Sequence, residues 1–124
     1  MKAAREFDPL LLRQMKGNFM KVYFIATAND CKKDKLGWLD WGKSHRVVGF
    51  FEDLETAKQA VEENWGDLYE DGYYKYAIIE EREDGLYSHC ETPLFYKWEG
   101  TIKDGGYKPI DRPEATKGFC CFTI

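Results

Sequence analysis

The fold is decided by the stretch His45-Arg-Val-Val-Gly-Phe-Phe-Glu-Asp-Leu-Glu-Thr-Ala-Lys-Gln-Ala-Val-Glu-Glu-Asn-Trp65, along which the spacing of hydrophobic residues changes. Residues 45–51 are rich in β-branched and aromatic side chains, which is typical of a strand. Asp53 then supplies an N-cap for a helix that we expect over about residues 54–65. Four apolar residues recur there on one helical face, namely Leu54, Ala57, Val61 and Trp65. The stretch therefore predicts a strand followed by an amphipathic helix that covers a sheet.

The sequence on either side of this stretch supplies further strands. Before it, residues 20–28 are largely apolar and predict a buried strand. After it, residues 72–81 and 94–98 are rich in aromatic side chains, and residues 107–110 predict a short edge strand, where Pro109 is tolerated. We therefore expect an α+β fold, an antiparallel sheet of about four to five strands with one main helix packed on one face.

The two ends of the chain carry apolar segments outside this sheet. Asp8 suits the N-cap of a short helix within an N-terminal extension, residues 1–19, which precedes a single domain over residues 20–124. Alternatively, Met20 is the natural start and the extension lies upstream of it. The apolar tail, residues 119–124, is expected to dock on the core or on a second subunit, and both ends together lead us to expect a homo-oligomer.

Composition and charge limit the classes of function. The chain has 124 residues, of which 44% are hydrophobic, and this fits one globular domain. Its net charge is −4, and residues 51–100 hold fourteen acidic residues against four basic ones. A segment this acidic repels the phosphate backbone of a nucleic acid, and we therefore expect no direct nucleic acid binding. It predicts either a solvated acidic face or an acidic patch that meets a basic partner protein.

Sorting and redox signals indicate the cytoplasm. No apolar run reaches the length of a membrane span, and the first residues do not resemble a secretory signal. The cysteines lack the spacing of a disulfide framework, at Cys31, Cys90, Cys120 and Cys121. We therefore expect a soluble cytoplasmic protein with reduced thiols and no membrane association.

The sequence carries no strong catalytic or metal-binding motif. Candidate zinc ligands lack paired spacing, and they are Cys31, His45, His89, Cys90 and Cys120. His89 and Cys90 are adjacent, and adjacent strand residues point to opposite faces, so they do not suit a nucleophile–base pair. Carboxylates cluster near the end of one strand, and they are Glu80, Glu81, Glu83 and Asp84. Two of these carboxylates would form a general acid/base pair if buried, or all are solvated. We therefore predict no metal, no cofactor and a binding protein, with a small hydrolase as an alternative.

Basic and aromatic residues that lie near one another predict a ligand pocket. Arg46 offers parallel hydrogen bonds to a phosphate or carboxylate, and it lies beside His45 and near two tryptophans of a loop. Aromatic rings would stack on a base. The candidate ligand-binding residues are Trp38, Trp41, His45, Arg46, Tyr74, Tyr76, Lys97 and Trp98. They predict a pocket for a nucleotide-like small molecule, unless Arg46 pairs with a surface carboxylate and the rings pack in the core.

Several runs of this sequence carry a resemblance to a known group of proteins. The runs are Phe51-Glu-Asp-Leu-Glu-Thr-Ala-Lys-Gln-Ala-Val-Glu-Glu-Asn64, Tyr73-Tyr-Lys-Tyr-Ala-Ile-Ile-Glu-Glu81, Gly85-Leu-Tyr87, Phe95-Tyr-Lys-Trp98 and Tyr107-Lys-Pro-Ile-Asp-Arg-Pro-Glu114. Over roughly residues 45–114, the chain resembles short proteins of anaerobic gut bacteria and their phages, a group with no assigned activity, so no catalytic residue is carried over. The resemblance implies a phage or prophage accessory protein. Such a viral protein would act by binding, either sequestering a nucleotide signal of a host defence system or blocking a host defence protein.

Overall fold

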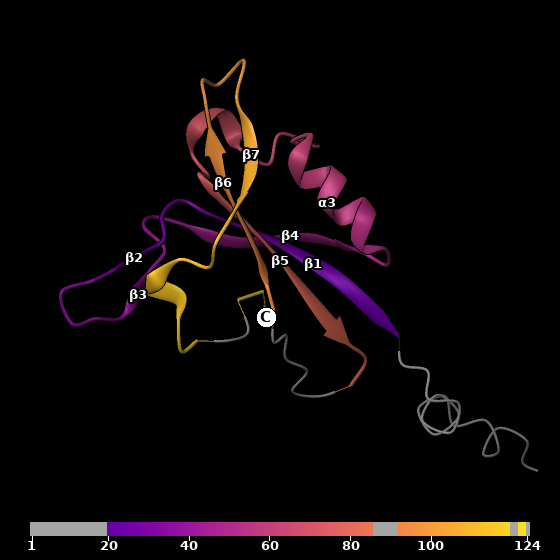
Figure 1. Ribbon diagram of the computed structural model, residues 1–124, viewed down its shortest axis with the longest axis horizontal. Coiled ribbons are helices and arrows are strands. Elements are labelled where there is room, and N and C mark those ends of the chain that lie inside the picture. Colours follow the sequence, from indigo (N-terminus) through magenta and orange to yellow (C-terminus); the bar gives the residue numbers. More distant parts are fainter. Residues whose placement is uncertain (1–19, 86–91, 120–121, 124) are drawn as a thin grey trace, which may run out of the picture.

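The computed structural model describes residues 20–85, 92–119 and 122–123, and its centre is a five-stranded antiparallel sheet (Figure 1). The strands lie in the order β4-β1-β5-β6-β7. Their bounds are β1 Lys21–Ala28, β4 His45–Phe51, β5 Tyr76–Glu83, β6 Leu94–Glu99 and β7 Gly106–Ile110. Helix α3, Leu54–Glu62, packs on one face, which we call the helix face, so the predicted α+β architecture is confirmed. The predicted N-terminal helix falls outside the described residues.

Helix α3 begins where the sequence predicts and ends earlier. The Asp53 carboxylate accepts hydrogen bonds from the amide and hydroxyl of Thr56 at 2.9 and 2.8 Å, which makes Asp53 the N-cap. The helix ends at Glu62 rather than near Trp65, so the predicted boundary was wrong. The cause is Asn64, which adopts a left-handed conformation with a φ of 54° and stops the regular helix.

The helix face of the sheet carries the larger core. Its buried members are Ile25, Ala57, Ala60, Val61, Leu68, Tyr69, Ala77, Ile79, Tyr96 and Tyr107. The Trp98 ring stacks on Tyr69 with centroids 3.7 Å apart, and the Tyr107 hydroxyl donates to the Tyr74 carbonyl at 2.5 Å. Three tyrosine rings therefore join aliphatic side chains in this core, and the Tyr107 hydroxyl finds its partner inside it.

The opposite face of the sheet is covered as well. Its buried cluster is Ala26, Ile78, Phe95 and Phe122. A small hairpin, β2 Lys32–Lys33 and β3 Leu39–Asp40, packs on this side, where the sequence predicted only a loop. The Glu80 carboxylate accepts hydrogen bonds from the amide and hydroxyl of Thr123 at 2.7 and 2.6 Å, and from Arg82 at 3.1 Å. The described tail residues Phe122 and Thr123 are therefore docked on the chain's own core, one of the two places that we expected.

Strand β5 starts later than predicted. It begins at Tyr76 rather than near residue 72. Left-handed conformations fill the preceding loop, at Asn64, Gly66, Asp67, Glu70, Asp71 and Gly72. Gly72 has a positive φ and Tyr73 has right-handed helical angles (φ −77°, ψ −43°), and neither conformation is extended, so the strand starts after them.

Candidate functional site

The predicted ligand-binding residues do not gather in one place. Arg46 and Trp98 project from the helix face, whereas His45, Tyr76 and Lys97 project from the opposite face. The cross-strand register sets this division, because side chains that face one another across neighbouring strands share a face. The sheet therefore separates Arg46 from Lys97, so these two cations do not face the same space.

Arg46 is held by three neighbours at the edge of the sheet. Its guanidinium forms an ion pair with the Glu70 carboxylate at 2.5 Å, and its Nε donates to the Thr27 hydroxyl at 3.2 Å. The guanidinium also lies 4.1 Å from the centre of the Tyr74 ring, and the Tyr74 hydroxyl is hydrogen-bonded to Ser44 at 2.9 Å. Arg46 thus forms the ion pair that was the alternative to ligand binding, and its charge is already compensated within the chain.

His45 and Trp41 form a stacked pair on the opposite face. Their ring centroids lie 4.4 Å apart with planes inclined by 10°, and Phe122 packs edge-on against Trp41 at 5.9 Å. Burial lowers the pKa of His45, while a hydrogen bond with the Phe122 backbone and the charge of Glu80 act in the other direction. Within the described structure, the buried Nε2 atom of His45 finds no hydrogen-bond partner. These rings hold the docked tail, so part of their surface is already covered.

The other predicted site residues lie apart from one another. The Lys97 ammonium lies 5.6 Å from the centre of the Tyr76 ring, a cation–π pair on the opposite face. Trp38 is 60% exposed near the β2–β3 hairpin, with its ring 6.4 Å from that of Phe119. Trp98 packs in the helix-face core. The aromatic residues singled out in the sequence therefore serve several packing roles rather than one pocket.

The described residues offer little support for a cysteine nucleophile, an acid/base pair of carboxylates or a metal site. Burial raises the pKa of the Cys31 thiol to about 11, so the nucleophilic thiolate is scarce at neutral pH. Glu80 is buried beside Arg82, whereas Glu81 lies 3.7 Å from Lys21 on the other side of the strand, so the two carboxylates do not form a pair. Over residues 20–85, 92–119 and 122–123, no three His, Cys, Asp or Glu side chains are grouped as a metal site requires.

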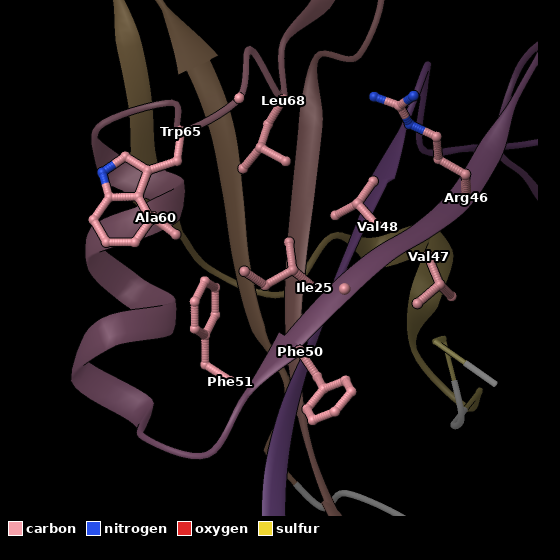
Figure 2. Close-up of a pocket in the computed structure, with 11 residues that line it drawn as sticks. Ile25, Arg46, Val47, Val48, Phe50, Phe51, Ala60, Trp65 and Leu68 are labelled. Atoms are coloured by element: carbon pink, nitrogen blue, oxygen red, sulfur yellow. The ribbon is translucent and has the colours of Figure 1, made fainter.

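A groove that the sequence did not predict runs along β4. It has a volume of about 560 Å³ and lies between β4, the end of α3 and residues 65–68 (Figure 2). Its walls include Val48 and the rings of Phe51 and Trp65, which meet edge to face at 5.9 Å. Arg46 stands at one end, and it is the one charged residue among the described residues that line the groove. Apart from Arg46, the side chains that line the groove are therefore apolar, while polar backbone groups are also exposed in it.

An irregularity in β4 brings the groove residues together. The register between β1 and β4 shifts in the middle of the two strands, which is a β-bulge. Val48 and Phe51 are three positions apart, so regular alternation would place them on opposite faces. Because the bulge resets the alternation, both lie on the helix side of β4, whereas Val47 and Phe50 lie on the other side (Figure 2).

The outer edge of β4 is open. Among the described strands, β4 pairs with β1 and with no other. The backbone N–H of Asn29 donates to the Ser44 carbonyl at 2.9 Å, so these two residues form a hydrogen-bonded pair. Along two antiparallel strands, hydrogen-bonded and non-hydrogen-bonded residue pairs alternate. Arg46 therefore bonds to β1, and Val47 directs its N–H and C=O groups outward. The apolar side chains of this edge are also exposed, Val47 by 42%, Val48 by 37% and Phe50 by 55%. Unpaired backbone groups and exposed apolar side chains together favour the addition of a strand from another chain.

The other edge of the sheet, β7, is protected against such pairing. Pro109 lies within β7, and the side chain of Lys108 beside it is exposed. Proline has no N–H to donate, and a lysine on an edge opposes burial under another chain. The seven residues of β4 include neither proline nor lysine, although the bulge locally increases the twist. The β7 edge therefore carries residues that oppose strand addition, whereas the β4 edge does not.

The chain matches no protein-family model, no curated protein and no solved structure. In the part of the chain that the structure describes, no helix is both long and apolar enough to cross a membrane. The open edge of β4 and the groove beside it are therefore the features from which a function can be inferred.

Proposed function

We propose that this protein is a non-enzymatic binding protein, which binds an extended segment of another polypeptide by strand addition to the outer edge of β4. The observation that carries this proposal is the open edge beside a groove lined mostly by apolar side chains. In strand addition, main-chain hydrogen bonds supply affinity, and sites for alternate side chains supply specificity. Val47 would exchange hydrogen bonds with the added strand. The side chains of that strand would alternate between the groove and the exposed ring of Phe50.

The aromatic rings of the groove provide an anchor for the bound segment. Trp65 is 40% exposed, although its indole N–H is satisfied by Glu63 at 2.9 Å. An exposed Trp ring beside Phe51 is the type of surface that dominates binding energy in protein interfaces. A leucine-sized or aromatic side chain of the partner would bury apolar area against both rings.

Acidic residues near the groove set the expected charge of the partner. Exposed carboxylates follow β4 and fill the loop after α3, at Glu52, Glu63, Asp67 and Asp71. We therefore expect the bound segment to be apolar in its centre and basic in its flanks. This agrees with the expectation that the acidic middle of the sequence meets a basic protein, and the resemblance to phage proteins suggests a host defence protein as that partner.

The test uses selected peptides rather than an unidentified partner. Random peptides displayed on phage are selected against the wild-type protein, and the dissociation constants of the chosen peptides are measured for Val47→Pro and Val47→Thr. Proline removes the outward N–H without touching the β1 pairing, whereas threonine keeps the N–H and the β-branched shape. We expect Val47→Pro to weaken binding at least about tenfold and Val47→Thr to change it little. Equal affinities for all three proteins would refute strand addition at β4.

A nucleotide-like small molecule is the second candidate, because Trp65, Phe51 and the Arg46 guanidinium border the same groove. A base would stack on the rings, and a phosphate would compete with Glu70 for Arg46. A panel of cyclic and linear nucleotides in a thermal-shift assay tests this candidate. A rise in the unfolding midpoint with one compound, abolished by Trp65→Ala, would support it, and a flat panel would remove it in this form.

A further inference from the structure

We propose that, when no other polypeptide is bound, a second copy of this chain occupies the open edge of β4. In this homodimer the two β4 strands pair antiparallel about a two-fold axis and join the two sheets. The inference rests on the proposed function, because self-pairing would regulate access to the same edge, and a partner would have to displace the second copy. It also provides a surface for the homo-oligomer that the sequence led us to expect, whereas the described tail residues pack on their own sheet.

The backbone of β4 is suited to this pairing. In a two-fold dimer the same edge serves both copies, so residues near the middle of one strand face their equivalents in the other. The outward N–H and C=O groups of Val47 would gain partners in both copies. The exposed ring of Phe50 already packs on Phe24 at a centroid distance of 5.3 Å, so both rings would become part of an apolar strip shared by the two sheets.

The charges at the two ends of β4 favour a second copy over an unrelated strand. Lys43 precedes the strand, Glu52 and Asp53 follow it, and all three side chains are exposed. Antiparallel pairing places the start of one strand beside the end of the other, so each Lys43 would face the acidic pair of the other copy. The match occurs twice in the dimer. The edge is therefore complementary to itself in charge as well as in hydrogen bonding.

The difference between the two edges also supports a closed dimer. Sheets usually protect exposed edges, because an unpaired edge strand pairs with other chains. The edge strand β7 follows this rule with Pro109 and Lys108, and β4 does not. A two-fold pairing of β4 would use the open edge of both copies and leave the protected β7 edge at each end of the described five-stranded sheets, so assembly through this sheet would stop at two.

The first test measures molecular mass by sedimentation velocity over a series from low micromolar to near-millimolar protein. We expect wild-type protein and Val47→Thr to dimerise reversibly. Val47→Pro should raise the dimer dissociation constant at least about tenfold, because it removes an inter-copy hydrogen bond at two symmetric positions. Phe50→Lys leaves the backbone intact and should act in the same direction, because it places a charge within the interface. Far-UV circular dichroism checks that each variant is folded.

The second test exchanges charges and mixes the variants. Lys43→Glu makes both junctions of a homodimer acidic, and Glu52→Lys places Lys43 opposite a second lysine. At low salt we therefore expect each variant to form a weaker homodimer than the wild type. An equimolar mixture restores opposite charges at both junctions, so native mass spectrometry, with one variant uniformly ¹⁵N-labelled to separate the masses, should show mainly heterodimers. Asp53 stays unchanged in both variants because it caps α3.

The outcomes separate this inference from the proposed function. A wild-type protein that stays monomeric throughout the series, or charge variants that mix statistically, would overturn self-pairing. If selected peptides still bound such a monomer through β4, with Val47→Pro impaired, the proposed function would stand without it. If the dimer forms, saturating selected peptide should convert it to monomeric complexes, and a dimer that persists unchanged would contradict displacement.

Discussion

The hydroxyl of Tyr107 helps to position the residues beneath the groove. The Tyr107 ring is buried and meets Tyr69 and Trp98 edge to face, and its hydroxyl donates to the Tyr74 carbonyl. Burial raises the pKa of Tyr107 far above its ordinary value, so the hydroxyl remains a donor at any working pH. Since the Tyr74 ring lies under Arg46, this hydrogen bond helps to position the charged end of the groove.

Replacing Tyr107 with phenylalanine tests this role. Tyr107→Phe keeps the ring and removes the donor, so the buried Tyr74 carbonyl loses this partner. We expect the free energy of unfolding to fall by about 1–3 kcal/mol, as measured by urea denaturation. Tyr73→Phe, at an exposed position, is the matched control and should change stability little. Equal stabilities of the two variants would mean that the buried hydroxyl makes no net contribution.

His45 makes stability depend on pH. Because burial lowers its pKa from the ordinary 6.5, the unfolded chain binds a proton more readily than the folded chain. The stability that neutral His45 contributes is therefore fully present above pH 6.5, and it is lost as the pH falls through the lowered pKa of the folded state. We expect His45→Gln to flatten this part of the profile, measured by urea denaturation between about pH 5 and pH 8. Identical profiles would contradict this assignment, since His89 is present in both proteins.

At the scale of an element, β5 gives two adjacent carboxylates different environments. Glu80 is buried and binds Thr123 and Arg82, whereas Glu81 is partly exposed beside Lys21. Glu80→Ala should lower the free energy of unfolding by about 3 kcal/mol or more, because it breaks a buried charged network. Glu81→Ala should cost less than about 1 kcal/mol, as is usual for an exposed ion pair. Similar losses in urea denaturation would show that the tail is not held through Glu80.

The elements were more predictable than their surroundings. The strand over residues 45–51, the Asp53 cap and the edge strand with Pro109 follow from spacing and local propensity, which the sequence displays directly. The end of α3 depended on the left-handed conformation of Asn64, for which the residue type is only a weak signal. The register shift in β4 lies next to Gly49, and a glycine inside a strand is a signal of a bulge, but the sequence alone does not fix the pairing with β1 that places the shift there.

The candidate site was less predictable, for a physical reason. Nearness in sequence led us to group Arg46 with His45, yet adjacent strand residues point to opposite faces. The carboxylate that binds Arg46 comes from Glu70 in a distant loop. Trp65 was expected on the buried face of a longer helix, and its place in the groove follows from the early end of α3. The apolar run of β4 was visible, but its position at an edge is a property of the whole sheet.

At the scale of the whole molecule, the sheet is covered on both faces, and its two edge strands differ in how far they are protected against pairing with another chain. Helix α3 packs on one face, and the β2–β3 hairpin with the tail packs on the other (Figure 1). One edge, β7, carries proline and lysine, and the other, β4, offers free backbone groups and apolar side chains. We therefore expect contacts with other polypeptides at β4 rather than at β7.

Amide hydrogen exchange at Val47, resolved by NMR, tests the central claim most directly. In dilute protein the Val47 amide should exchange readily while that of Arg46, bonded to β1, is protected. A selected peptide should slow exchange at Val47 at least about tenfold, and raising the protein concentration should act in the same direction through self-pairing. Binding that leaves Val47 unchanged, or that protects the region around Trp41 instead, would contradict a function at the edge of β4.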